Sequence, residues 1–211
     1  VVLTRDYVTE TLSVDGVKYH YQQIESGFTQ PNARVNEKML SWASSCCAQM
    51  EDANKGDLVE LYCGNGNFTT VLAQHFKRVL ATEISKISVR SAETNFSLNK
   101  VDNVSVVRMS SEEFTQALNG ERPFRRLKDI DLGSYEFSTI FVDPPRAGLD
   151  EGTLRLAQRF DNILYISCNP ETLRANLDSL SETHEIVRTA IFDQFPWTHH
   201  LESGILLQRR R

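Results

Sequence analysis

The chain has 211 residues, of which 40% are hydrophobic and 24% charged, and its formal net charge is −5 at pH 7. This composition is typical of an ordinary globular protein, and no apolar run approaches the ~18 residues of a membrane-spanning helix. The amino terminus lacks signal-peptide character, and the four cysteines lack the paired spacing of a metal site. We therefore expect a cytoplasmic protein without a metal. The first residue, Val1, suggests a piece of a longer chain.

The first fifty residues predict a hairpin and then a helix. Residues 6–24 alternate loosely between apolar and polar side chains, with a break at Asp15-Gly16, a pair typical of tight turns. Phe28-Thr-Gln-Pro-Asn32 follows this segment. We place Pro31 at the first position of a helix that runs to about Met50, because proline there loses no hydrogen bond.

From Gly56 onward the pattern changes to repeated β–α units. Alternation of this kind predicts a doubly wound, mostly parallel α/β sheet, with right-handed crossovers that place the loops after the strands at one edge. The polar span 120–135 is expected to be a long loop, and the last two strands should form an antiparallel pair. The expected strands are residues 58–62, 78–83, 104–109, 139–143, 163–167, 186–192 and 204–207.

A cysteine ends the fifth of these strands. The apolar run from Ile163 stops at Cys168, and Pro170 suits the first turn of a helix. Cys168 should therefore lie at the carboxyl edge of the sheet, where ligands bind in open α/β folds. The alternative for an isolated cysteine is a buried packing residue.

Two further strand ends indicate a ligand that contains adenosine. Gly64-Asn-Gly66 lets the backbone approach a ligand closely, and Glu83 follows Gly64 by 19 residues, near the ~20-residue spacing of an acid that binds ribose hydroxyls. A third glycine and a P-loop lysine are both absent, which favours S-adenosylmethionine over a ligand with phosphates. Asp143-Pro-Pro-Arg146 would hold a rigid, extended backbone beside it.

Cys168 then acquires a chemical role. A methyl donor brings its own electrophile, so the protein must make the acceptor nucleophilic, and a thiolate that adds to C6 of a pyrimidine does so for C5. The thiol needs a lowered pKa, which the start of the helix near Pro170 could favour. The C5 proton must later go to a general base. Candidate bases are Glu171, Asp193, His199, His200 and Glu202.

Five motifs in this order make the chain resemble the RNA 5-methyluridine methyltransferases, and most closely their tRNA branch. The resemblance spans nearly the whole chain. The motifs are Phe28-Thr-Gln-Pro-Asn32, Glu60-Leu-Tyr-Cys-Gly-Asn-Gly-Asn-Phe68, Phe141-Val-Asp-Pro-Pro-Arg146, Tyr165-Ile-Ser-Cys-Asn-Pro-Glu-Thr-Leu173 and Asp193-Gln-Phe-Pro-Trp-Thr-His-His-Leu-Glu202.

The resemblance implies a fold and a set of site residues. The fold would be the seven-stranded, Rossmann-like sheet of class I S-adenosylmethionine-dependent methyltransferases. Cys168 would be the nucleophile and Glu202 the proton acceptor, with Arg146 a further active-site residue and histidines 199 and 200 structural or substrate-orienting. The residues expected to contact S-adenosylmethionine are Gln30, Tyr62, Asn67, Glu83 and Asp143.

The resemblance also implies a substrate and a division of the chain. The expected reaction is methylation of C5 of the uridine in the T-loop of tRNA, with the T-arm as partner and with no metal or protein partner. Residues 1–27 would be a hairpin that leads in from an RNA-binding amino-terminal region, and residues 28–211 the catalytic domain. The alternatives are a ribosomal-RNA uracil-5 methyltransferase, an amino-group methyltransferase of DNA or protein, and an RNA-binding module without activity.

Overall fold

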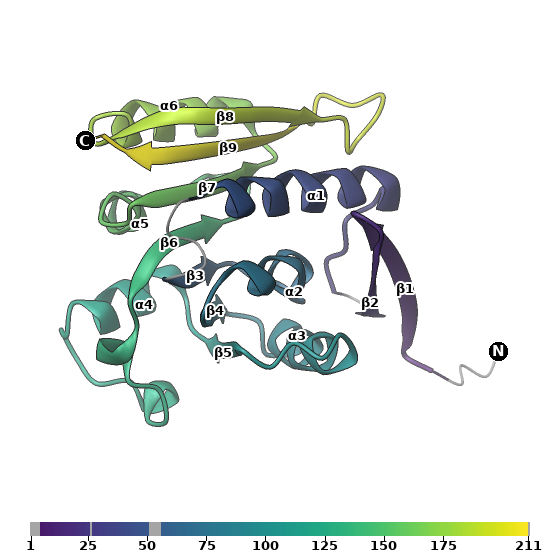
Figure 1. The fold of residues 1–211 in the computed structure, drawn as a ribbon, viewed down its shortest axis with the longest axis horizontal. Coiled ribbons are helices and arrows are strands. Elements are labelled where there is room, and N and C mark those ends of the chain that lie inside the picture. Colours follow the sequence, from purple (N-terminus) through teal and green to yellow (C-terminus); the bar gives the residue numbers. More distant parts are fainter. Residues whose placement is uncertain (1–4, 26, 51–55, 211) are drawn as a thin grey trace.

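The computed structural model of the chain describes residues 5–25, 27–50 and 56–210. Nine strands form two sheets, a hairpin of β1 and β2 and a seven-stranded sheet in the order β5-β4-β3-β6-β7-β9-β8 (Figure 1). The strands are β1 (Tyr7–Val14), β2 (Val17–Ile24), β3 (Asp57–Leu61), β4 (Val79–Glu83), β5 (Val104–Arg108), β6 (Phe137–Val142), β7 (Asn162–Ser167), β8 (His184–Phe192) and β9 (Glu202–Arg209).

Six α-helices and three short 3-10 helices connect the strands in the described part of the chain. None of these helices is long and apolar enough to cross a membrane. The α-helices are α1 (Ala33–Gln49), α2 (Asn67–Leu72), α3 (Lys86–Leu98), α4 (Ser111–Leu118), α5 (Glu151–Ala157) and α6 (Pro170–Leu180). The 3-10 helices are η1 (Ala73–His75), η2 (Arg125–Leu127) and η3 (Leu132–Ser134).

The large sheet confirms the doubly wound, mostly parallel arrangement expected from the sequence. Strands β3 to β7 pair in parallel, whereas β9 lies antiparallel between β7 and β8. From β3 the chain moves outward through β4 and β5 and then returns to place β6 on the other side of β3. The strand order therefore reverses between β3 and β6, and at such a point the strand ends open a crevice for a ligand.

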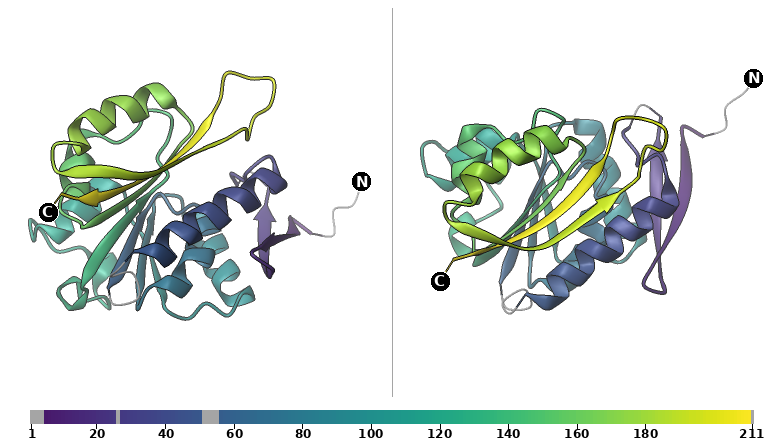
Figure 2. Two further views of the ribbon diagram at one scale, coloured as in Figure 1. Left: turned by 45° about the horizontal axis from the view of Figure 1, so that its top comes forward. Right: turned by 90° about the horizontal axis from the view of Figure 1, so that it is seen from above.

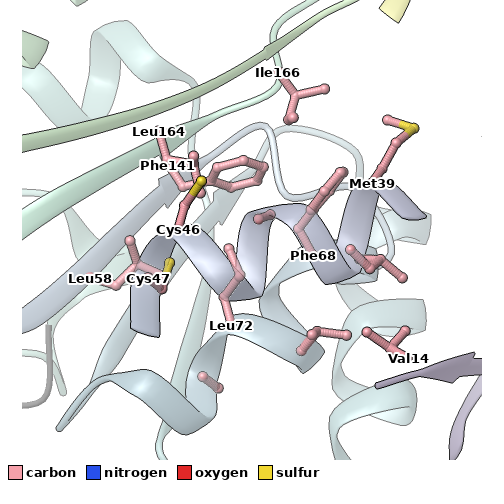
Figure 3. Close-up of a cluster of buried hydrophobic side chains, with 14 of the residues drawn as sticks. Val14, Met39, Cys46, Cys47, Leu58, Phe68, Leu72, Phe141, Leu164 and Ile166 are labelled. Carbon is pink, nitrogen blue, oxygen red and sulfur yellow. The ribbon is translucent and has the colours of Figure 1, made fainter. Parts of the chain in front are cut away.

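Helices cover both faces of this sheet and divide the core into two clusters. On one face α1 and α2 pack against side chains such as Phe141, Leu164 and Ile166, and this cluster includes the buried Cys46 and Cys47 of α1 (Figure 3). On the other face α4, α5 and α6 pack through Phe114, Leu156, Leu173 and Leu180. Parallel strands covered on both faces explain why β3 and β7 are buried throughout.

The hairpin of β1 and β2 stands beside α1 and α3 as a separate small sheet (Figure 2). Its buried residues Leu12, Val14, Tyr19 and Tyr21 belong to the core cluster of α1 and α2, and Tyr21 is fully buried there. The backbone N–H of Gln22 donates to Oδ1 of Asn95 on α3 at 2.7 Å. The hairpin therefore shares a core with the large sheet; residues 1–4 of the predicted lead-in lie outside the described residues.

Several local details differ from the sequence prediction. Strands β8 and β9 begin at His184 and Glu202, before the expected residues 186 and 204. Helix α1 begins after Pro31, because the side chain of Asn32 accepts from the N–H of Val35 and caps the helix. Tyr62 lies beyond the end of β3 and has a positive φ of 63°. Strand β6 begins at Phe137, before the expected residue 139. Helix α5, capped by Asp150, was not predicted.

Candidate active site

A cavity of about 550 Å³ opens at the carboxyl ends of β3, β4, β6 and β7, over the point where the strand order reverses. All seven residues expected from the sequence to act on the cofactor or the substrate line it. They are Gln30, Tyr62, Asn67, Glu83, Asp143, Cys168 and Glu202. The fold therefore brings together side chains from segments that are far apart in the sequence.

The pairing of β7 with β9 places Cys168 beside Glu202. Cys168 follows the last residue of β7, and Glu202 is the first residue of β9. Ser167 pairs with Ser203 in this antiparallel ladder, so the thiol and the carboxyl group emerge at the same end of two neighbouring strands. Cys168 is half-buried, whereas Glu202 is only 4% exposed.

The turn after β3 presents backbone atoms to the cavity. Gly64 and Gly66 both have positive φ, a conformation that glycine adopts without strain. A Cβ atom on Gly64 would meet no atom within 4 Å, so this residue leaves its backbone open to the cavity. Oε2 of Glu83 accepts from the N–H of Gly64 at 3.1 Å, and Oε1 accepts from the N–H of Ser85 at 2.7 Å. The turn and β4 thus fix the Glu83 carboxylate.

Asn67 is held by a reciprocal pair of amide hydrogen bonds with Asn36 of α1. Each side-chain amide donates to the other, at 3.0 and 2.9 Å. Asn36 is only 2% exposed, and the hydroxyl of Tyr21 also donates to the carbonyl oxygen of Asn67 at 2.9 Å. The start of α2 is therefore fastened both to α1 and to the hairpin.

Gln30 is oriented by a residue from the far end of the chain. Nε2 of Gln194, in the loop between β8 and β9, donates to Oε1 of Gln30 at 2.7 Å. Gln194 is only 1% exposed and Gln30 is partly buried, so this hydrogen bond is partly shielded from water. Gln30 itself lines the cavity, and its side-chain N–H groups have no hydrogen-bond partner among the described residues.

Three acidic side chains share the interior of the cavity, and burial raises the pKa of each. Burial raises the pKa of Glu60 to about 8, helped by the nearby charge of Asp143. Burial raises the pKa of Glu202 to about 7. The pKa of Asp143 lies well above its ordinary value, because of burial and then the charge of Glu202. Oε2 of Glu60 and Oε2 of Glu202 have no hydrogen-bond partner among the described residues.

The pKa of the Cys168 thiol moves opposite to the expected direction. Burial raises it, and the charges of Glu202 and Asp143 raise it further, whereas Arg146 lowers it. Helix α6 begins at Pro170 as predicted, with Asn169 as its cap. The start of this helix therefore does not outweigh desolvation and two neighbouring carboxyl groups.

Arg146 extends from the Asp143-Pro-Pro-Arg146 turn toward the same cavity. Its backbone oxygen accepts from the side chains of Asn169 and Thr172, both at 3.1 Å, which attaches the turn to the start of α6. Its Nη1 donates to Nδ1 of His200 at 2.7 Å. Of the five candidate bases, Glu202 and His200 line the cavity, whereas Glu171, Asp193 and His199 are exposed and are not part of its lining.

Sequence reasoning missed four contributors to the site. Glu60 was seen only as part of a motif, although a carboxyl group within an apolar buried strand is a signal for a special environment. Asn36 and Gln194 gave no local signal, because each acts on a site residue through a contact distant in sequence. Phe195 also lines the cavity and packs edge-on against His200, with ring centroids 5.6 Å apart.

Solved structures with similar folds include methyltransferases that act on RNA. Pyrococcus abyssi tRNA (uracil-54, C5)-methyltransferase in complex with S-adenosyl-L-homocysteine matches with a TM-score of 0.71 and 24% identity, over 97% of this chain and 45% of that one. Thermus thermophilus 16S rRNA N2 G1207 methyltransferase in complex with AdoMet and guanosine matches with a TM-score of 0.67 and 16% identity, over 100% of this chain and 52% of that one. The fold is thus that of class I S-adenosylmethionine-dependent methyltransferases, as expected.

Sequence comparisons are more specific. Curated proteins called tRNA/tmRNA (uracil-C(5))-methyltransferase share 64% identity in Cellvibrio japonicus and 60% in Vibrio vulnificus strain CMCP6, in each case over 100% of this chain and 56% of the relative. The chain thus spans about half the length of these relatives. The family model described as tRNA (Uracil-5-)-methyltransferase matches residues 1–210. The chain therefore belongs to the tRNA (uracil-5-)-methyltransferase family.

Proposed function

We propose that this chain is the catalytic part of an enzyme that uses S-adenosylmethionine to methylate C5 of a uridine in tRNA. The observation that carries the proposal is the shared cavity, in which a half-buried thiol and a buried carboxyl group lie beside the glycine turn and Glu83. Family membership supports the same reaction. We further propose that residues 28–211 form the catalytic domain and that residues 1–27 form the hairpin that leads into it.

The residues present fit S-adenosylmethionine. The open backbone at Gly64 admits a ligand, and the Glu83 carboxylate retains lone pairs for the two ribose hydroxyls after accepting two backbone N–H groups. The oriented amides of Gln30 and Asn67 supply further polar contacts, with Tyr62 and Asp143 completing the set. When bound, the cofactor supplies an electrophilic methyl group.

The chemistry assigned to this chain begins with Cys168. Its thiolate forms a bond to C6 of the uracil, and the electron pair of the C5–C6 double bond moves to give an enolate whose C5 is nucleophilic. C5 then takes the methyl group and becomes tetrahedral. A base removes the C5 proton, the electron pair re-forms the double bond, and the Cys168 sulfur leaves C6. The thiolate is regenerated, and the net change at C5 is replacement of a proton by a methyl group.

Glu202 is the base that the geometry favours for this last step. It lies at the same strand end as Cys168, and its pKa of about 7 suits a group that must accept a proton near neutral pH. His200 also lines the cavity, but it accepts a hydrogen bond from Arg146 through Nδ1. We assign His200 and Arg146 to orientation of the substrate.

The uridine of the T-loop in tRNA is the proposed target, because the motifs resemble the tRNA branch of the family. A base within a folded loop has to be flipped out to reach a cavity at this depth, at a cost of a few kcal/mol. Ribosomal RNA is the second candidate substrate, and an exocyclic amino group of a base is the third candidate acceptor. Methylation of an exocyclic amino group would not require the neighbouring Cys168 and Glu202.

Methyl transfer to defined RNAs tests this proposal. The chain is incubated with isotopically methyl-labelled S-adenosylmethionine and either unmodified tRNA or a ribosomal-RNA fragment, and the labelled nucleoside is identified by digestion and mass spectrometry. We expect label in 5-methyluridine at the T-loop of tRNA, and none with Cys168→Ala. Label in an N-methylated base, or equal labelling by Cys168→Ala, would rule out the thiol mechanism. Preference for the ribosomal fragment would reassign the substrate.

A further inference from the structure

A second groove lies directly beside the catalytic cavity, and we propose that it binds the nucleotide next to the target uridine on the RNA strand. This inference rests on the proposed function and extends it to a surface for the RNA backbone. The groove has a volume of about 580 Å³. Its walls are residues 31–34 at the start of α1 and residues 194–196 with Thr198 in the loop between β8 and β9.

The groove continues the catalytic cavity. Phe195 lines both, so its ring forms a shared wall between them. The loop that carries Phe195 projects from the ends of β8 and β9 over the amino-terminal end of α1 (Figures 1 and 2). A strand that delivers a flipped base to Cys168 therefore has its neighbouring nucleotide at this groove.

One wall is suited to a phosphate. The Arg34 side chain is 86% exposed, and its present partner is Glu37, with a distance of 3.2 Å between Nη1 and Oε2. The first turn of α1 contains no acidic residue, and in the described part of the chain the N–H groups of Ala33 and Arg34 have no hydrogen-bond partner. Free N–H groups at the start of a 17-residue helix, with a guanidinium beside them, favour an anion.

The opposite wall holds an unsatisfied acceptor. Gln194 lines the groove and is only 1% exposed. Its Nε2 donates to Gln30, whereas its Oε1 has no partner among the described residues. An acceptor left unpaired in this position costs stability, and because the atom is buried a ribose hydroxyl in the groove reaches it only when the Gln194 side chain moves.

An exposed tryptophan stands at the rim. Trp197 lies between the groove residues Pro196 and Thr198, its side chain is fully exposed, and its backbone has a positive φ of 68°. Strained backbone at a bulky residue is a feature of functional sites. Flipping one base leaves its neighbours without a stacking partner, and an exposed indole provides one. We assign the phosphate to Arg34 and the base to Trp197.

Binding of a fluorescein-labelled RNA stem-loop with uridine in the loop tests the groove by fluorescence anisotropy. Because stacking of one base on an aromatic ring is worth ~1–3 kcal/mol, Trp197→Ala should weaken binding by about 5- to 160-fold, and Trp197→Phe should recover most of the loss. RNA affinity falls as salt concentration rises. In Arg34→Ala the slope of log affinity against log salt concentration should be shallower by about 1, because one phosphate contact is lost.

Two controls separate this surface from the rest of the protein. Affinity for S-adenosylhomocysteine, measured by calorimetry, should be the same in all variants, because neither Trp197 nor Arg34 lines the catalytic cavity. Arg125→Glu changes an exposed arginine in the segment between α4 and β6, on the opposite side of the molecule, and should not change RNA affinity (Figure 1). If both Trp197→Ala and Arg34→Ala bind RNA with wild-type affinity, the proposed role of the groove is wrong and the proposed function still stands. Absence of RNA binding by the wild-type chain would overturn the groove and the proposed function together.

Discussion

Cys168 lies near two acidic side chains and one arginine, and these neighbours act on the pKa of the proposed nucleophile. Burial, Glu202 and Asp143 all raise the pKa of the thiol, and Arg146 opposes them. A thiol with a raised pKa is mostly protonated at neutral pH and therefore reacts slowly with electrophiles. We therefore expect the reactivity of this proposed nucleophile to depend on the charge state of its neighbours.

Neutralising Glu202 should make Cys168 more reactive toward a simple alkylating agent. In Glu202→Gln the second-largest cause of the raised pKa is gone, so the pH at which Cys168 is half alkylated by iodoacetamide should fall. In Arg146→Gln this pH should rise, because the positive charge that lowers the pKa of the thiol is gone. Mass spectrometry of the Cys168 peptide gives the rates, and the buried Cys46 and Cys47 serve as unreactive internal references. Unchanged profiles in both variants would show that these charges do not act on the thiol.

Individual residues were predictable where a motif ended a strand, and not where a contact spans the chain. Glu83 and Asp143 end predicted strands and Cys168 follows one, so their meeting at one edge follows from parallel topology. The bond between Gln194 and Gln30 joins residues 164 positions apart, and no local pattern encodes it. The direction of the pKa shift at Cys168 likewise depends on burial and on neighbours that only the folded chain defines.

At the scale of elements, the turn between β3 and α2 depends on two glycines for different reasons. Both have positive φ, +57° at Gly64 and +79° at Gly66. A Cβ at Gly66 would lie 2.6 Å from Cε1 of Phe96 on α3, whereas a Cβ at Gly64 would have open space around it. Gly66 therefore allows α3 to pack closely, and Gly64 leaves room for a ligand.

Alanine at the two glycines should separate these roles. Each substitution should cost ~1–2 kcal/mol for the positive φ, and Gly66→Ala should cost a further ~1–3 kcal/mol because Phe96 must move. Urea unfolding measures both free energies. Gly64→Ala, in contrast, should lose more affinity for S-adenosylhomocysteine than its stability loss explains. Equal losses of stability in the two variants would contradict the packing role of Gly66.

The helices show where the sequence pattern is sufficient to predict the start of a helix and where it is not. Helix α6 begins at its predicted proline, and its cap Asn169 was part of the quoted motif. Helix α1 had two residues able to start it, Pro31 and Asn32, and the side-chain cap of Asn32 decided the position. Helix α5 has only seven residues, about two turns, which is too short for a recognisable apolar period.

For the whole molecule, the sequence indicated an alternating α/β sheet but not its strand order. Alternation limits the topology to parallel pairing with right-handed crossovers. Which strands become neighbours depends on long-range packing, such as that of Phe68 of α2 on Phe141 of β6, with ring centroids 4.9 Å apart. The insertion of β9 between β7 and β8 brings Glu202 to the site, and the resemblance to a family rather than periodicity predicted that meeting.

The buried Glu60 should make stability of the whole fold depend on pH. Burial raises the pKa of Glu60 to about 8 in the folded chain, from the ordinary 4.5 of an exposed glutamate. As pH rises from about 4.5 to 8, the unfolded chain loses this proton while the folded chain keeps it, so ionisation favours unfolding. Glu60→Gln has no carboxyl group to ionise. The unfolding free energy of this variant minus that of the wild type should therefore increase with pH from about 4.5 to 8 and stay constant above that range. A difference that is constant from pH 5 to 9 in urea titrations would contradict the burial of a proton at Glu60.

We propose that Cys168 forms a covalent bond with uracil C6 during methyl transfer. An RNA stem-loop with 5-fluorouridine at the target position tests it, because fluorine at C5 cannot leave as a proton does and the thioether persists after methylation. Mixed with S-adenosylmethionine, the wild-type chain should give a slowly migrating adduct on a denaturing gel, with the RNA on the Cys168 peptide.

Two cysteine variants complete this measurement. Cys168→Ala should give no adduct. Cys63→Ala, which changes another cysteine that lines the cavity, should give as much as the wild type. An adduct formed by Cys168→Ala, or none formed by the wild-type chain, would contradict covalent catalysis at this site.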